Sequence, residues 1–157
     1  MTTIFLTNVY NKPDEYVSSL KKKGFVDFND GVSTFKNVQK LEADDLIKSI
    51  EKLLDAELVL SFARMSPLGQ EEPNFIHKDD MHGDYTAILY LNKTYPTGYG
   101  TTLYDEDDNE ILVCKAKYNS LFIFPSNIKH SRNCLHNFGE GDEARLVQVM
   151  FLKLKNG

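Results

Sequence analysis

Two histidines and an aspartate have the residue types and spacing of a metal site. His77 and Asp79 are two residues apart, and residues i and i+2 of an extended chain point to the same side. Both can therefore reach one ion. His130, which follows the apolar run 121–124 and a Pro-Ser-Asn turn, is the candidate third ligand from a distant β segment. Two histidines and one carboxylate leave open metal positions, which suits Fe(II) that binds a co-substrate and O₂ together. Asp80 is less suitable than Asp79, because alternation places it on the opposite side from His77.

Arg145 is a candidate binder of an anion. It begins the last expected strand, 145–154, in which the residues on both faces are mainly apolar. Such a strand is expected to be buried on both sides, where an arginine is costly unless an anionic group meets it. A planar guanidinium can hold a carboxylate through two hydrogen bonds. The alternatives are an ion pair with an internal Asp or Glu, or contact with water at the end of the strand.

The elements that must position these residues are mostly strands. The first part of the chain predicts short strands at 4–6 and 25–28, a helix capped by Asn11 and closed by Gly24, and a helix at 43–55. Seven strands in roughly 100 further residues indicate a sandwich or barrel, with the two helices packed on one face. No repeat or linker divides the chain, so we expect one domain over 1–157, with a helical buttress at 1–57 and a β-barrel core at 58–154. The seven expected strands are 58–65, 75–77, 85–91, 101–104, 111–114, 121–124 and 145–154.

Composition narrows the classes of partner. The 157 residues include 18 Lys and Arg against 23 Asp and Glu, which gives a formal net charge of −5. Nucleic-acid binding normally requires a basic excess, so DNA or RNA is disfavoured as a partner. Two cysteines are too few for a disulfide framework and favour a reducing, cytoplasmic setting. No apolar run approaches the roughly 18 residues of a membrane span, and the first residues do not have the pattern of a signal peptide.

Four motifs in order resemble the Fe(II)/2-oxoglutarate-dependent oxygenases, above all their small bacterial, phage-type and prolyl-hydroxylase-like branch. They are the segment 77–91 with its His-x-Asp, the segment 98–101, the run 124–126 that leads to His130, and the segment 145–149. The resemblance covers about residues 58–154. It implies a double-stranded β-helix, the jelly-roll or cupin-like barrel, buttressed by two helices.

The resemblance also implies a role for each residue. His77, Asp79 and His130 would hold Fe(II), and 2-oxoglutarate would chelate the iron through its keto and C1 carboxylate oxygens. Arg145 would bind the far carboxylate of 2-oxoglutarate, and Tyr90 would donate a hydrogen bond to it, although Tyr90 also fits a plain core position. The presence of a carboxylate at the Asp79 position implies hydroxylation rather than halogenation, with O₂ consumed and succinate and CO₂ formed.

Two assignments stay open. The interval from His130 to Arg145 is longer than in the most compact members of the family, and His136 is the rival third ligand. The approach 124–131 resembles that of the family to its distal histidine and favours His130, which leaves 133–142 as a loop. Arg64, on the expected strand before the metal motif, either faces the pocket, where it would meet an anionic substrate, or lies at the surface.

The sequence therefore predicts an Fe(II)- and 2-oxoglutarate-dependent dioxygenase that hydroxylates an unactivated C–H bond of a small molecule or a protein residue. Two alternatives differ in class: a non-catalytic, cupin-like barrel that binds a metal or ligand, and an interaction module with an incidental His-x-Asp. The short chain leaves little length for loops over the site. An open site suits a macromolecular substrate or completion by a second subunit of a homodimer.

Overall fold

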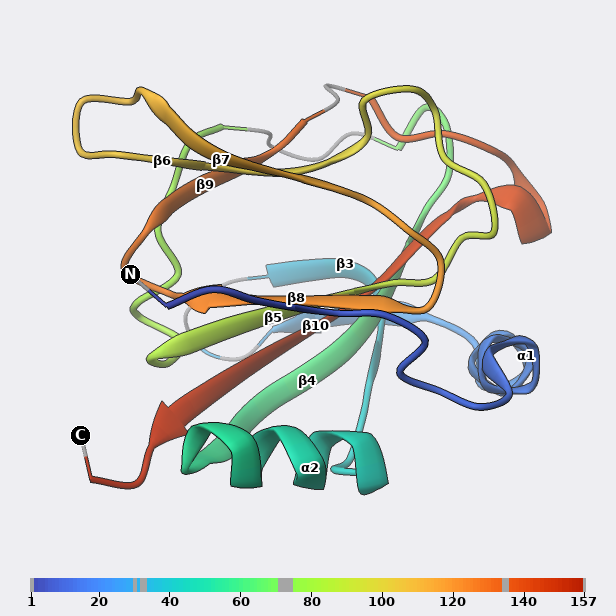
Figure 1. Cartoon of the computed structure of the whole chain (residues 1–157). Helices are drawn as coiled ribbons and strands as arrows, with labels where there is room; N and C mark the ends of the chain where they lie inside the picture. The colour runs from blue at the N-terminus through green and yellow to red at the C-terminus, as the bar shows by residue number, and fades with distance from the viewer. Residues whose placement is uncertain (1, 30, 32–33, 71–74, 134–135, 157) are drawn as a thin grey trace.

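Two antiparallel sheets face each other in the computed structural model, which describes residues 2–29, 31, 34–70, 75–133 and 136–156. Within these residues, the larger sheet has the strand order β1-β8-β5-β10-β4-β3-β2 and the smaller sheet the order β7-β6-β9. Figure 1 shows the smaller sheet above the larger one, with helix α2 below both. This arrangement confirms the predicted jelly-roll barrel, mostly β with two helices.

The elements have the following bounds. The helices are α1 (Pro13–Lys23), α2 (Asp45–Leu54) and the short 3-10 helix η1 (Gly141–Glu143). The strands are β1 (Ile4–Leu6), β2 (Val26–Asn29), β3 (Thr34–Lys40), β4 (Ala56–Ser66), β5 (Tyr85–Tyr90), β6 (Gly100–Tyr104), β7 (Glu110–Lys115), β8 (Ser120–Pro125), β9 (Lys129–Arg132) and β10 (Arg145–Leu154).

Strand β10 lies in the middle of the larger sheet, antiparallel to both β4 and β5. On one face, Leu146 and Met150 are buried in the core that the helices cover. On the other face, Arg145, Val147 and Val149 line a cavity between the two sheets. The expectation that this strand is buried on both faces is confirmed, and the strand joins the core to the cavity.

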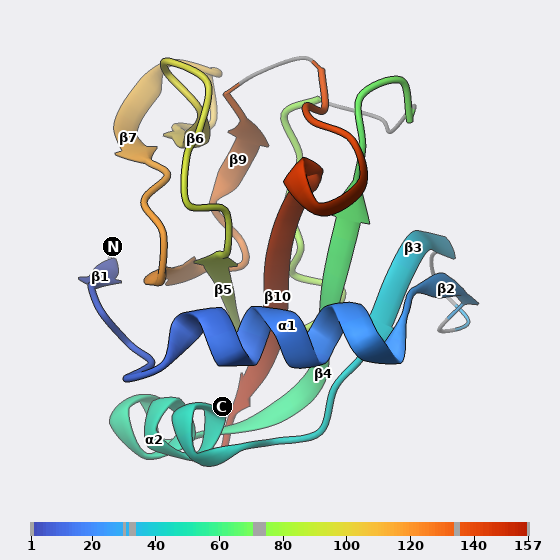
Figure 2. The same cartoon turned by 90° about the vertical axis from the view of Figure 1, so that its right-hand side faces the viewer.

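Both helices cover the face of the larger sheet that is turned away from the smaller sheet (Figures 1 and 2). Helix α2 begins after Asp44, whose carboxylate accepts a hydrogen bond from the backbone N–H of Ile47 at 3.0 Å and so caps the helix. The predicted cap of α1 at Asn11 is wrong. That helix begins at Pro13 after Lys12, whose side chain makes no capping bond. Pro13 preorganises the first turn, and Asp14 and Glu15 in that turn favour the helix start. In the described residues, no helix is long and apolar enough to cross a membrane.

The sheets contain strands that the sequence pattern did not predict. Residues 1–57 hold the two expected helices and the expected strands β1 and β2, and the unpredicted strand β3 also extends the larger sheet. Strands β3 and β9 were missed because Lys, Asn, Gln, Ser and Arg interrupt their apolar alternation. The expected strand at 75–77 reduces to one bridge residue, His77. Part of the expected loop 133–142, residues 134–135, lies outside the described residues.

Gly100 is a position where the fold admits no side chain. It begins β6 beside the cavity with a φ of +156°, and a Cβ there would lie 2.0 Å from the carbonyl oxygen of Cys114 on β7. We expect Gly100→Ala to lower the free energy of unfolding by about 2 kcal/mol or more, because the clash is with backbone. Urea denaturation measures this loss. Gly98→Ala is the matched control: its φ is +80° but nothing lies within 4 Å, so only the strain of about 1 kcal/mol is lost. Equal losses would contradict the prediction.

Candidate metal centre

The fold brings together the three predicted metal ligands. His77 and His130 form an isolated antiparallel bridge, in which the backbone N–H of each donates to the carbonyl of the other at 3.0 and 2.9 Å. The Nε2 atom of His130 lies 2.9 Å from Oδ2 of Asp79, and Nε2 of His77 lies 3.5 Å from Oδ1. One donor atom from each residue lies within 4.8 Å of the others. The three side chains thus converge on one point between the sheets.

The second ring nitrogen of each histidine is engaged by the backbone. Nδ1 of His77 lies 2.8 Å from the carbonyl oxygen of Phe75, and Nδ1 of His130 lies 3.1 Å from that of Ile128. A carbonyl oxygen can only accept, so Nδ1 of each ring is the donor in these contacts and Nε2 is the ring nitrogen that faces Asp79. Hydrogen bonds of this kind fix the tautomer and orientation of metal-binding histidines. Both Nε2 atoms are therefore ready to bind an ion beside Asp79.

Asp79 is held as a carboxylate beside the two rings. Its backbone N–H donates to the carbonyl of Ser126 at 2.9 Å, which ties the metal motif to the end of β8. Burial acts to raise the pKa of Asp79, but the hydrogen bond from His130 and the electrostatic attraction of the histidine rings outweigh burial and hold the pKa below its usual value. The ionised carboxylate is the form that binds a metal.

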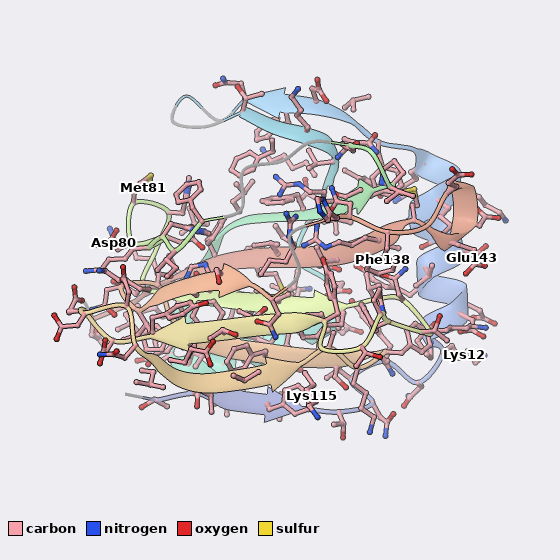
Figure 3. All side chains as sticks on the ribbon, turned by 90° about the horizontal axis from the view of Figure 1, so that it is seen from above. Lys12, Asp80, Met81, Lys115, Phe138 and Glu143 are labelled. Carbon is pink, nitrogen blue, oxygen red and sulfur yellow. The ribbon has the colours of Figure 1, made fainter. Side chains whose placement is uncertain are left out.

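The alternative ligands lie elsewhere. Asp80 is exposed, and Figure 3 shows it beside Met81 at the outer edge of the turn after the metal motif. His136 is also exposed. The remaining histidine, His82, stacks on the ring of Phe151 at a centroid distance of 4.7 Å. Among the residues that the structure describes, the group able to hold a metal consists of His77, Asp79 and His130.

A cavity of about 190 Å³ contains the triad and lies between the two sheets. Pockets for drug-sized ligands usually have volumes of about 300–1,000 Å³, so this cavity fits a small molecule. A larger surface hollow of about 650 Å³ lies beside α1 and includes none of the triad. The polar and charged side chains that line the triad's cavity, besides the triad itself, are Arg64, Thr86, Tyr90, Tyr99, Thr101, Ser131, Arg132 and Arg145.

Arg145 lies at the cationic end of this cavity. Its Nη1 atom is 3.5 Å from both Oγ of Ser66 and Oδ1 of Asn137, and its guanidinium lies 5.7 Å from the ring centroid of Tyr99. Nη1 of Arg132 donates to the same Asn137 oxygen at 3.3 Å. Asn137 is oriented by its own amide, which donates to the backbone of Gln70 at 2.8 Å. One amide oxygen thus contacts two guanidinium groups, and this end of the cavity is cationic.

Sequence reasoning missed Arg132 and Asn137. Arg132 is two residues after His130, so a strand there would have placed both side chains on one face. The pattern 129–132 carries no apolar alternation, and the strand was not predicted. Asn137 gives no local signal, because its position depends on the path of the chain between β9 and β10.

Tyr90 is buried and faces the same cavity from β5. It is 1% exposed, and its hydroxyl lies 2.7 Å from the hydroxyl of Thr101 on β6. Burial raises the pKa of Tyr90 well above its usual value, so the hydroxyl stays protonated and can donate a hydrogen bond. Tyr90 also packs in the apolar cluster between the sheets. Tyr90 is therefore both a buried core residue and a residue that lines the cavity.

Solved structures identify the fold, although no protein-family model and no curated protein matches the sequence. The epimerase SnoN from nogalamycin biosynthesis, a non-heme alpha-ketoglutarate-dependent enzyme, has a TM-score of 0.64 and 14% identity over 94% of this chain and 76% of its own. A Pseudomonas putida prolyl-4-hydroxylase has a TM-score of 0.63 and 13% identity, over 96% and 91% of the two chains. The viral collagen prolyl hydroxylase of Paramecium Bursaria Chlorella virus-1 has a TM-score of 0.61 and 12% identity, over 97% and 89%.

The chain has the fold of the iron- and 2-oxoglutarate-dependent oxygenases. The resemblance stated from the sequence is confirmed at the level of the fold. This oxygenase fold carries different reactions in its solved examples, an epimerisation in SnoN and a prolyl hydroxylation in the viral enzyme, as their names state. The fold thus positions a site, and the side chains of that site decide the chemistry.

Removing one ligand of the triad tests the candidate metal centre. We expect His130→Ala and Asp79→Ala each to weaken Fe(II) binding at least about 100-fold, because loss of an outer-shell partner alone costs about 10–100-fold. Anaerobic metal titration measures the affinity. His136→Ala and Asp80→Ala are matched controls, since both residues are exposed, and should change it less than about twofold. A loss on His136→Ala that equals the loss on His130→Ala would contradict the assignment.

Proposed function

We propose that this protein is an Fe(II)- and 2-oxoglutarate-dependent dioxygenase that hydroxylates an unactivated C–H bond. The observation that carries the proposal is the placement, in one cavity of about 190 Å³, of the His77, Asp79 and His130 group and the guanidinium of Arg145. Metal ligands and a guanidinium in one small cavity suit a small dianionic co-substrate. The shared oxygenase fold supports the same conclusion.

The donor set fits Fe(II). His77 and His130 present Nε2 and Asp79 presents a carboxylate oxygen, and two histidines with one carboxylate are the ligands of non-heme Fe(II) oxygenases, which keep open positions. Bound iron together with 2-oxoglutarate supplies the reductive activation of O₂. In the balanced reaction, 2-oxoglutarate, O₂ and R–H give succinate, CO₂ and R–OH, with one oxygen atom of O₂ in succinate and the other in the alcohol.

Arg145 and Tyr90 are the residues that would hold the far carboxylate of 2-oxoglutarate. A guanidinium can make two parallel hydrogen bonds to a carboxylate, and the neutral Tyr90 hydroxyl can donate a third. Both residues line the cavity, from β10 and β5. Their task is to fix the co-substrate by its far end, so that its keto acid end meets the metal ligands.

In this proposal the enzyme hydroxylates its substrate. Asp79 is a metal ligand here, so its position is not available to a halide ion. The substrate is a small molecule or a protein residue, and the fold examples include both kinds by name. A homodimer and a cytoplasmic location stay predictions from the sequence.

Arg145→Met separates co-substrate binding from metal binding. We expect the variant to bind 2-oxoglutarate at least about 30-fold more weakly, since loss of one partner of a buried charge pair costs about 2–5 kcal/mol. Fe(II) affinity should change less than about threefold, because Arg145 donates no metal ligand. Titration of the anaerobic Fe(II) protein with 2-oxoglutarate, followed by its visible charge-transfer band, measures the first affinity, and anaerobic metal titration measures the second. An equal fall in iron binding would show that the role given to Arg145 is wrong.

Turnover of 2-oxoglutarate distinguishes an enzyme from a binding barrel. With Fe(II), ascorbate and O₂, we expect slow formation of succinate from 2-oxoglutarate even without the substrate, and none in His130→Ala. Succinate is measured by mass spectrometry, and Asp80→Ala is the control that should keep the wild-type rate. A wild-type protein that binds Fe(II) and 2-oxoglutarate but never forms succinate, with or without candidate substrates, would be a non-catalytic cupin-like barrel.

A further inference from the structure

Arg64 is a cavity residue that the proposed reaction does not use. It lies on β4, where it pairs with Val147 of β10 and Val38 of β3. Its side chain lines the same cavity as the triad. Its guanidinium carbon lies 5.4 Å from the ring centroid of Phe62 and 5.8 Å from that of Phe35. The two aromatic faces thus orient a half-buried cation at the wall of the site.

Strand register places Arg64 on the opposite flank of the cavity from Tyr90. Val147 pairs with Tyr90 on one side and with Arg64 on the other. Neighbouring strands lie about 4.8 Å apart, so these two positions are separated by about 10 Å across the cavity floor. Tyr90 is 1% exposed, whereas Arg64 is half-buried. The Arg64 flank is therefore the one nearer to solvent, where a substrate would approach.

The charge of the cavity differs in sign from that of the whole chain. The three arginines of the sequence are Arg64, Arg132 and Arg145, and all three line this cavity, although the formal net charge is −5. Among the described lining residues, Asp79 is the one carboxylate. Arg132 and Arg145 meet at Asn137, at the end assigned to the co-substrate. Arg64 lies on the neighbouring strand, two residues along β4 from Ser66, which pairs with Arg145. Its guanidinium lies over the rings of Phe62 and Phe35 instead, so we assign it a second anion.

An aromatic surface surrounds Arg64. Phe62 lies 4.7 Å from Phe35 and 6.3 Å from Phe151 between ring centroids, and all three rings line the cavity. A cation among aromatic faces complements a molecule that has an apolar part and an anionic group. The small volume of the cavity also indicates that the co-substrate fills much of it and that the substrate lies along this wall.

We propose that the substrate carries a carboxylate or phosphate group, that Arg64 binds this group, and that Phe35, Phe62 and Phe151 contact its apolar part. The inference deepens the proposed function and rests on it. Arg64 is a specificity-determining residue here. A planar guanidinium binds either anion through two hydrogen bonds, so the two chemistries are separated by experiment.

The test uses three matched probes on the anaerobic protein loaded with Fe(II) and saturating 2-oxoglutarate. The probes are phenylacetate, phenyl phosphate and the neutral phenylacetamide, and calorimetric titration measures their affinities. We expect the wild-type protein to bind at least one anion about tenfold or more tightly than the amide. The anion that binds more tightly identifies the group. Arg64→Met should remove the preference and keep the 2-oxoglutarate band, and Arg64→Lys should restore part of the preference.

Arg132→Met is the matched control. It should weaken 2-oxoglutarate binding, because Arg132 shares Asn137 with Arg145, and should keep the preference for the anion once 2-oxoglutarate is saturating. A wild-type protein without a preference, or a folded Arg64→Met protein that keeps the full wild-type preference, would overturn the inference. Absence of the 2-oxoglutarate band in the wild-type protein would instead overturn the proposed function, so the two failures are distinguishable.

Discussion

The site depends on a pair of backbone hydrogen bonds between His77 and His130. This bridge ties the segment after β4 to the edge strand β9 and sets the two imidazole rings 4.3 Å apart between centroids. A third backbone bond, from Asp79 to Ser126, fixes the carboxylate at the same end of the barrel. Because the backbone supplies the register, and backbone carbonyls engage both Nδ1 atoms, the Nε2 atoms and the carboxylate are left to bind a metal. Ligands that are positioned in advance lose little conformational freedom on binding.

Strand β10 contributes residues both to the main core and to the cavity. Its Leu146 and Met150 pack in the core under the helices, while Val147 forms the cavity floor between Tyr90 and Arg64. Arg145 begins the same strand, and its side chain lines the same cavity as Val147. Packing of the core and geometry of the site are therefore properties of one strand. The Gly100 backbone, which approaches Cys114 too closely for any side chain, closes the cavity from the smaller sheet.

The arginines of this chain are concentrated around the cavity of the oxygenase fold. An acidic chain gathers all three of its arginines around one cavity. Two of them contact Asn137, and the third lies over the rings of Phe62 and Phe35. Solved proteins of the same fold include an epimerase and prolyl hydroxylases, so the scaffold alone does not select a substrate. Selection is a matter of the side chains along the wall, and in this chain that wall is cationic and aromatic.

The sequence by itself determined which side chains within one segment lie on the same face. Strand alternation put His77 and Asp79 on one side and excluded Asp80, and the apolar faces of 145–154 predicted a strand buried on both sides that begins with Arg145. Only the tertiary structure decided which residues of distant segments come together. It places His130 rather than His136 beside the other two candidate ligands, and it brings Arg132 and Asn137 next to Arg145. Periodicity reports which side chains share a face of one segment. It cannot report which segments pair, and a polar strand such as β9 has no apolar period, because its side chains serve the cavity instead of the core.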